Sequence, residues 1–144
     1  MFKRILVPLD ESETVEKVLS ILTEEAELHK AEVVLIKVIA HLRPTLRALP
    51  TMVEEAVGQL DDYAQYYLDD IAEDLREKGL TVTTKIDRGQ PAVRILEYAK
   101  SSHCDLIIIG SHGWTHSIRW RFGSISNYIV RAKTNIPILF VPTG

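Results

Sequence analysis

Three glycines with neighbouring hydroxyl residues form the pattern in this sequence that is most suggestive of chemistry. Gly110 and Gly113 follow an apolar run. Nine residues then separate Gly113 from Gly123, which comes directly before a helical pattern that begins with Ser124. Glycine lets the backbone approach a ligand closely, and the free N–H groups at a helix N-terminus attract an anion. The spacing therefore predicts a phosphate-binding loop, in which Ser124 and Ser126 can add hydroxyl donors.

The same residues also have a purely structural interpretation, in which Gly110 and Gly113 turn the chain and Ser124 caps a helix. Two common phosphate-binding motifs, Gly-x4-Gly-Lys-Ser/Thr and Gly-x-Gly-x2-Gly, are absent from the sequence. A P-loop NTPase and a dinucleotide-binding Rossmann protein are therefore disfavoured. The Gly-x-Ser-x-Gly turn that a serine hydrolase requires is also missing.

Other candidate sites are weaker. His112 and His116 have the i, i+4 spacing of zinc ligands, but they lie in an expected loop without a nearby third ligand, so we predict no metal site there. Cys104, the one cysteine, precedes an apolar run and is expected to be a small buried residue. The acidic pairs 61–62 and 69–70 are expected to be solvated on the polar face of a helix.

The elements that would position these residues follow from the hydrophobic pattern. Short apolar runs rich in β-branched residues predict five strands, at 5–7, 33–39, 80–86, 106–109 and 138–141. Three- and four-residue apolar spacing predicts helices at 15–26 and 51–78, a third helix beginning near Pro91, and a fourth over 124–133. The alternation predicts one α/β domain over residues 1–144, with a doubly wound, Rossmann-like parallel sheet covered by helices on both faces.

In such a fold the ligand crevice lies beyond the carboxyl ends of the strands, where the direction of winding reverses. Two places are therefore most important: the end of the first strand, at Pro8-Leu9-Asp10, and the end of the fourth, at Gly110. A carboxylate such as Asp10 at a strand end is a good acceptor for sugar hydroxyls.

Length and charge limit the partners of this protein. The chain has 144 residues, with 20 acidic and 17 basic residues and a net charge of −3. Nothing in this balance draws the protein to nucleic acid or to anionic lipid, so a phosphate must be held locally. The apolar runs are too short to span a bilayer, and no secretory signal follows Met1, so we expect a cytoplasmic protein without membrane insertion.

Over essentially its whole length the sequence resembles the universal stress protein family. The resemblance rests on residues 5–10 (ILVPLD), 35–38 (LIKV), 89–91 (GQP), 105–110 (DLIIIG), 136–141 (IPILFV) and the glycine pattern. In that family, Gly, two residues, Gly, nine residues and Gly-Ser/Thr mark the ATP-binding branch. This chain keeps every fixed position of that pattern.

The resemblance implies the strand order 3-2-1-4-5, with an adenine nucleotide across the switch point. Pro8 and Asp10 would flank the adenine and ribose, the backbone of Val38 would meet the adenine, and Gly110 would lie under the ribose. The residues implied at the nucleotide are Pro8, Leu9, Asp10, Val38, Gly110, His112, Gly113, Gly123, Ser124, Ile125 and Ser126. The ligand would be ATP, or ADP or AMP, and Mg²⁺ would bridge the phosphates if hydrolysis takes place.

Three features depart from the family pattern. Glu11 stands where many members have glycine, and Lys37 where histidine is common. The segment 114–122 is unusually aromatic and basic, so its arginines could neutralise phosphates and its tryptophans could contact a partner. The alternative is that this segment is a surface arm whose aromatic residues pack on the body of the protein.

The leading functional hypothesis is a dimeric, ATP-binding stress-response regulator, in which the nucleotide biases contacts with a regulatory protein partner. The family implies a homodimer, through the apolar C-terminal strand at 137–141. One alternative is an enzyme that slowly hydrolyses ATP or transfers a nucleotidyl group, although no general base stands out and the catalytic residues are unknown. Another is a nucleotide-independent adaptor for a partner such as a transporter.

Overall fold

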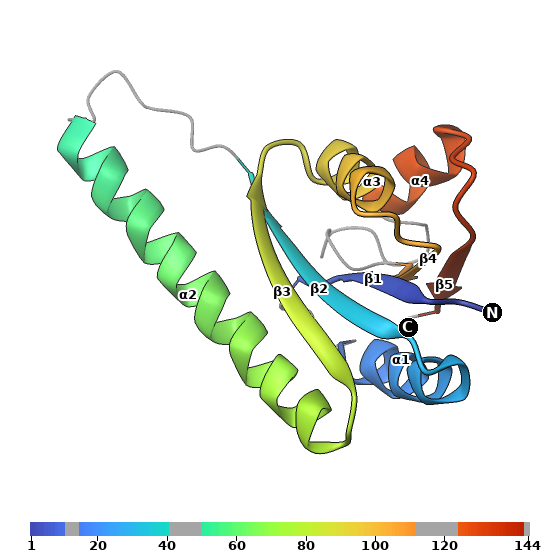
Figure 1. Ribbon diagram of the computed structural model, residues 1–144. Helices are drawn as coiled ribbons and strands as arrows, with labels where there is room; N and C mark the ends of the chain where they lie inside the picture. The colour runs from blue at the N-terminus through green and yellow to red at the C-terminus, as the bar shows by residue number, and fades with distance from the viewer. Residues whose placement is uncertain (11–14, 41–49, 112–123, 143–144) are drawn as a thin grey trace.

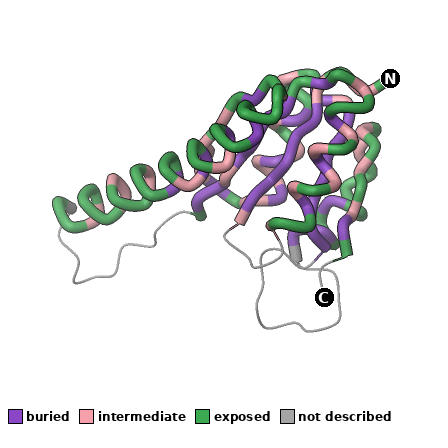
Figure 2. The backbone as a smooth tube through the Cα atoms, turned by 90° about the horizontal axis from the view of Figure 1, so that it is seen from below, coloured by how far each residue is buried: buried purple, intermediate pink, exposed green. Residues whose placement is uncertain are grey.

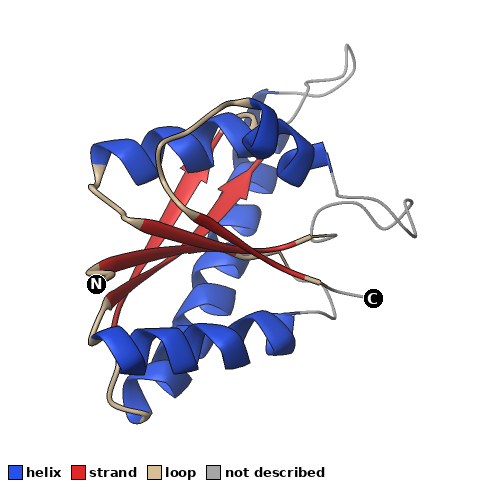
Figure 3. Cartoon of the chain, turned by 90° about the vertical axis from the view of Figure 1, so that its right-hand side faces the viewer, coloured by secondary structure: helices blue, strands red, loops and turns tan. Residues whose placement is uncertain are grey.

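The computed structural model describes residues 1–10, 15–40, 50–111 and 124–142 of the chain. In these residues, strands and helices alternate along the sequence, and the helices lie on both sides of one sheet (Figures 1 and 3). The elements are β1 (Arg4–Pro8), α1 (Val15–His29), β2 (Glu32–Ile39), α2 (Pro50–Glu77), β3 (Thr81–Arg88), α3 (Pro91–Ser101), β4 (Leu106–Gly110), α4 (Ser124–Arg131) and β5 (Ile138–Val141).

The sheet has the order β3-β2-β1-β4-β5, and every strand is parallel to its neighbours. The predicted α/β class and strand order are therefore confirmed. In the register, Leu6 of β1 lies opposite Val34 of β2 on one side and Ile107 of β4 on the other. The winding reverses between β1 and β4, because the chain first builds outward to β3 and then returns to the other edge of β1.

Two apolar cores, one on each face of the sheet, hold the layers together. Ile5 and Val7 of β1 join the core that contains α1 and α2, while Leu6 between them joins the core that contains α3 and α4. Because helices cover both faces of the parallel sheet, most residues of β1, β2 and β4 are buried, which explains the continuous apolar runs of these central strands. The edge strands β3 and β5 each have a single buried residue.

Local signals set several element boundaries. Helix α3 begins at Pro91 as predicted, and the side chain of Gln90 caps it by accepting a 2.7 Å hydrogen bond from the backbone N–H of Val93. Helix α2 is followed by Gly79, whose φ of +90° suits glycine, as the sequence predicts. Strand β3 runs two residues beyond its predicted end, to Arg88, because the ladder with β2 continues to Ile39.

Helix α2 is longer than the strand beside it. At about 1.5 Å per residue, its 28 residues extend about 42 Å. The 8 residues of β3 extend only about 26 Å. The buried side chains of α2 begin at Ala64 and continue with Leu68, Ala72 and Leu75. The first half of the helix projects past the sheet, and its tube is coloured mostly exposed (Figure 2).

The apolar stripe predicted for this helix therefore reaches the core only in its second half. Val53 and Val57 are half-buried, and Leu60 is 39% exposed. Among the described helices none, including α2, is long and apolar enough to cross a membrane.

Two leucines of α2 provide a matched test of this arrangement. Leu68→Ala should lower the free energy of unfolding by about 2–5 kcal/mol, because it leaves a cavity against the sheet. Leu60→Ala, the same substitution in the projecting half, should cost less than about 1 kcal/mol. Urea denaturation of the two variants measures the difference, and equal losses would contradict the burial pattern.

Candidate functional site

The carboxyl ends of β1 and β4 lie side by side at the point where the winding reverses. Beyond β1, Leu9 is buried and its N–H donates a 2.9 Å hydrogen bond to the carbonyl of Ile36 in β2. The next residue, Asp10, is half-buried. Asp10 lies just after the end of β1, and Gly110 is the last residue of the neighbouring strand β4. These two predicted positions are therefore both at the carboxyl end of the sheet.

The first turn of α4 contacts the end of β4. The hydroxyl oxygen of Ser126 lies 3.5 Å from the carbonyl oxygen of Gly110 and 3.4 Å from that of Ser111. Having one proton, this buried hydroxyl donates to one of the two carbonyls at a time. The backbone N–H of Ser111 in turn donates to the carbonyl of Val141 in β5, at 2.9 Å. Residues from two separate parts of the glycine pattern thus meet at the edge of the sheet.

The side chains of α4 restrict what this turn can offer to a ligand. Ile125 is buried in the core on the α3 side of the sheet, together with Ile129. The hydroxyl of Ser126 is engaged with protein carbonyls. Backbone N–H groups are therefore the donors that these two positions would contribute, a role that suits the N-terminus of a helix.

Val38 lies where β2 extends beyond β1. The ladder between β1 and β2 ends at the pair of Pro8 and Ile36, whereas the ladder between β2 and β3 continues through Val38 to Ile39. The side chain of Val38 is buried in the α3 and α4 core. On the side of β2 that faces β1, the backbone of Val38 therefore lies beyond the last residue pair of the β1–β2 ladder.

Several predicted positions fall outside the described residues. They are His112, Gly113 and Gly123 of the candidate loop, the second histidine His116, the arm 114–122 and Glu11. Ser124 is described as the first residue of α4 by its backbone alone.

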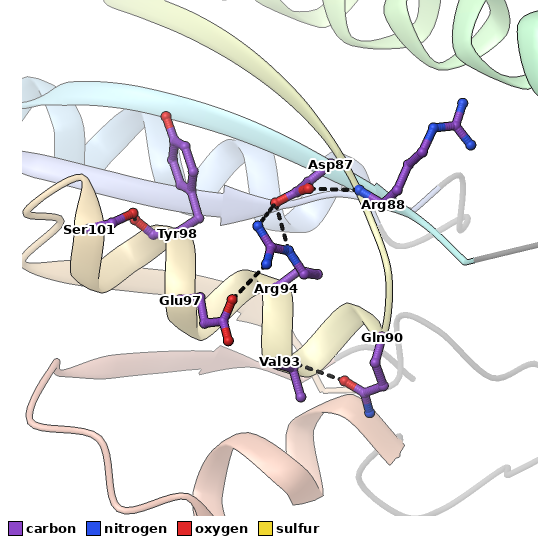
Figure 4. Close-up of polar contacts among 8 residues, drawn as sticks. All are labelled: Asp87, Arg88, Gln90, Val93, Arg94, Glu97, Tyr98 and Ser101. Carbon is purple, nitrogen blue, oxygen red and sulfur yellow. Dashed lines mark hydrogen bonds and ion pairs between the residues drawn. The ribbon is translucent and has the colours of Figure 1, made fainter.

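A polar network that the sequence analysis did not identify lies at the end of β3 (Figure 4). The guanidinium of Arg94 in α3 donates two hydrogen bonds to one carboxylate oxygen of Asp87, at 2.9 and 2.8 Å, and a third to Glu97, at 2.6 Å. The other carboxylate oxygen of Asp87 accepts the backbone N–H of Arg88, at 2.8 Å. Because Asp87 lies opposite Val38 in the register, this network supports the same edge of the sheet.

Arg88 links the network to α2. Its guanidinium forms an ion pair with Asp61 and lies 3.4 Å from the carbonyl oxygen of Val57. The expectation that the 61–62 pair is merely solvated is therefore wrong for Asp61, whose partner lies on a strand 27 residues away in the sequence. The only sequence signal was a charged pair, Asp87-Arg88, at a strand end just before Gly89-Gln90-Pro91.

The charge of Asp87 is stabilised by its partners. Burial alone would raise the pKa of this carboxyl, but the hydrogen bonds from Arg94 and Arg88 and the nearby charges of Arg94 and Lys85 outweigh it and lower the pKa below its usual value. The same pairing raises the pKa of Arg94. The pair therefore stays ionised at neutral pH.

The described part of the chain supports neither a metal site nor a reactive cysteine. Within it, no three His, Cys, Asp or Glu side chains are grouped so that they could hold a metal ion. Cys104 is buried as expected, and burial raises the pKa of its thiol, which disfavours the reactive thiolate.

Comparison with known proteins identifies relatives over almost the full length. A family model described as the universal stress protein family matches residues 1–142. Universal stress protein MJ0577 of Methanocaldococcus jannaschii is 29% identical over 155 residues, which cover 98% of this chain and 95% of the relative. Universal stress protein YxiE of Bacillus subtilis is 28% identical over 148 residues, covering 98% of this chain and 99% of the relative.

Solved structures show the same architecture. The structure of MJ0577 has a TM-score of 0.86 and 30% identity, and the match covers 100% of this chain and 98% of that one. A universal stress protein of Archaeoglobus fulgidus in complex with dAMP has a TM-score of 0.65 at 22% identity, with 96% of this chain and 97% of that chain covered. A universal stress protein in complex with cAMP has a TM-score of 0.71 at 18% identity, with 99% and 98% covered. At such identities the last two show likeness of fold.

The lowered pKa of Asp87 predicts how stability depends on pH. A carboxyl whose pKa is lower in the folded state adds stability that is complete above its unfolded value, about 3.9, and is lost as the pH falls through the folded value. Asp87→Asn should therefore be less stable than the wild type at neutral pH, and the gap should narrow below about pH 4.

Urea denaturation between about pH 2.5 and about pH 7 measures this gap, with Asp70→Asn as the control at an exposed position. A gap that is the same at every pH would contradict the proposed ionic pairing of Asp87.

The contact of Ser126 with the end of β4 gives a separate prediction. Ser126→Ala should lower the free energy of unfolding by about 1 kcal/mol, because it removes the one buried hydroxyl that the carbonyls of Gly110 and Ser111 share as a donor. Ser101→Ala removes an exposed hydroxyl from α3 and should cost less than about 0.5 kcal/mol. Faster amide hydrogen exchange in α4 of the Ser126 variant alone would locate the effect, whereas identical behaviour of the two variants would exclude the contact.

Proposed function

This chain belongs to the universal stress protein family, and we propose that it binds an adenine nucleotide at the carboxyl edge of β1 and β4 and acts as a nucleotide-dependent regulator in the stress response. The observation that carries the proposal is the contact between Ser126 and the carbonyls of Gly110 and Ser111. It brings the N-terminus of α4 to the end of β4, as a phosphate-binding turn requires.

We assign the phosphates to the N-terminus of α4. The backbone N–H groups of Ser124, Ile125 and Ser126 are the proposed donors, since the side chains of the last two are engaged elsewhere. His112, Gly113 and Gly123 complete the proposed loop. Such oriented donors, aided by the helix dipole, can hold an anion on a protein whose net charge is −3.

The nucleoside is assigned to the edge between β1 and β2. The carboxylate of Asp10 is the proposed acceptor for ribose hydroxyls, and Gly110 would lie beneath the ribose. Pro8 and Asp10 would flank the adenine and ribose, with Leu9 between them in the chain, and the backbone of Val38 beyond the last β1 pair supports an adenine contact there. The dAMP and cAMP complexes of the two fold relatives support adenine as the base.

The resident ligand is proposed to be ATP, with ADP or AMP as the alternatives. Mg²⁺ would accompany the phosphates and bridge them if hydrolysis takes place. We propose that the chain works as a cytoplasmic homodimer that pairs through β5. In support, β5 is an edge strand of the sheet, and its Leu139 is exposed.

Nucleotide content and turnover test the proposal. Mass spectrometry of the freshly purified, denatured protein should detect adenine nucleotide, and calorimetry should give binding with at least one of ATP, ADP and AMP. A regulator should turn ATP over negligibly, so rapid steady-state hydrolysis would favour the enzyme alternative. The absence of any adenine nucleotide in both measurements would overturn the proposal.

A glycine pair localises the site. Gly123→Val should weaken ATP binding about tenfold or more, because a side chain directly before α4 would obstruct the approach of the phosphates. Gly58→Val is the matched control, since a Cβ at position 58 of α2 meets no atom within 4 Å. Circular dichroism verifies that both variants fold, and equal ATP affinities would place the phosphates elsewhere.

A further inference from the structure

A strip of large apolar side chains is exposed along α2, from its projecting first half to the start of the half that covers the sheet. Met52, Leu60, Tyr63 and Tyr66 are 58%, 39%, 55% and 73% exposed, and Ala56 between them is also exposed. The first four strip positions are spaced by four, four and three residues, so they follow one face of the helix. We call Met52, Ala56, Leu60, Tyr63 and Tyr66 the α2 strip.

The α2 strip is separate from the stripe that anchors the helix. The anchoring positions Ala64, Leu68 and Leu75 are buried against the sheet. Met52 and Ala56 lie beyond the end of β3, because Arg88, the last residue of that strand, contacts Val57 and Asp61. Tyr63 and Tyr66 lie beside β3, where Gln65 contacts Thr84, but they are exposed, on a face of the helix away from the buried positions. Single exposed apolar residues are ordinary, but several large ones on one helical face are typical of an interaction surface, and methionine and tyrosine are enriched in such surfaces.

The strip is bordered by negative charge. Helix α2 carries nine carboxylates and one arginine, a net charge of −8, in a chain whose total is −3, so the rest of the chain carries +5. Glu55, Asp62 and Asp69 are exposed at seven-residue intervals beside the strip. Nearby, a groove of about 550 Å³ between α2 and β3 is lined by Asp61, Asp62, Gln65, Ile86, Asp87 and Arg88. Arg88 pairs with Asp61 there and Arg94 pairs with Asp87, so Asp62 is the carboxylate of this groove that belongs to the row beside the strip.

An apolar strip bordered by carboxylates favours a partner that is both apolar and basic. We propose that the α2 strip is a docking surface for a basic, amphipathic helical segment of a partner protein. The apolar face of that segment packs on the strip, and its lysines or arginines meet the row of Glu55, Asp62 and Asp69. A second α2 fits poorly, because pairing two such helices would oppose two charges of −8. The proposal goes beyond nucleotide binding and does not depend on it.

The test uses the full chain and a synthetic peptide of about 18 residues, made of leucine and lysine so that an apolar face is flanked by positive charge. Fluorescence anisotropy should give binding that weakens when salt is raised from about 50 mM to about 200 mM. A peptide with glutamate in place of lysine should not bind. Added ATP should leave the affinity for the peptide unchanged, because the α2 strip is separate from the proposed nucleotide site.

Variants locate the binding. Leu60→Ser combined with Tyr63→Ser should weaken it about tenfold or more, whereas Leu28→Ser, at a position in α1 that is 74% exposed, should not. Glu55→Lys combined with Asp62→Lys should weaken it as well, and Glu24→Lys combined with Glu27→Lys on α1 should not. All of these positions are exposed, so circular dichroism should show the wild-type fold in each variant.

Four outcomes would overturn the proposal. The first is equal binding by the Leu60/Tyr63 and Leu28 variants, and the second is equal binding of the two peptides. The third is self-association of the wild type in sedimentation equilibrium that the Leu60/Tyr63 variant abolishes, since the occupant would then be a second copy. The fourth is tighter peptide binding after Leu42→Ser and Leu46→Ser, since the chain's own residues 41–49 would then compete for the strip.

Discussion

The requirement to bury both faces of a parallel sheet governs this molecule. The central strands β1, β2 and β4 must present apolar side chains to both faces of the sheet, and each crossover must place a helix on one face or the other. Ile5 and Val7 satisfy one face of β1, and Leu6 satisfies the opposite face. With β1 at the centre, two strands are built on each side of it, so the winding has to reverse between β1 and β4.

That reversal creates the candidate site. The connections that leave β1 and β4 run to opposite sides of the sheet. In such a fold a crevice forms beyond the carboxyl ends of these two strands, where backbone groups and helix N-termini are available to a ligand. Around this edge the polar groups are held by neighbours: Asp87 by Arg94, and Ser126 by the end of β4. Anion binding here would depend on oriented dipoles, and this is compatible with a slightly acidic chain.

The projecting half of α2 results from a difference in length between this helix and the strand beside it. Helix α2 has far more residues than the strand it covers, so its first half has no sheet beneath it. The ion pair between Arg88 and Asp61 fastens the helix near the end of β3. Beyond that point the helix keeps its apolar residues, although burial no longer requires them.

The sequence by itself determined the local structure: apolar runs gave the strands, three- and four-residue spacing gave the helices, and Gly79 and Pro91 marked boundaries. It also led to the family, the strand order and the candidate glycine loop. Only the tertiary structure decided which distant groups meet, such as Ser126 with Gly110, Arg88 with Asp61, and Arg94 with Asp87. It also decided that Leu68 is buried while Leu60 is exposed. The reason is that periodicity and propensity act over a few residues, whereas burial and ion pairing depend on how far a neighbouring strand extends, which no single segment encodes.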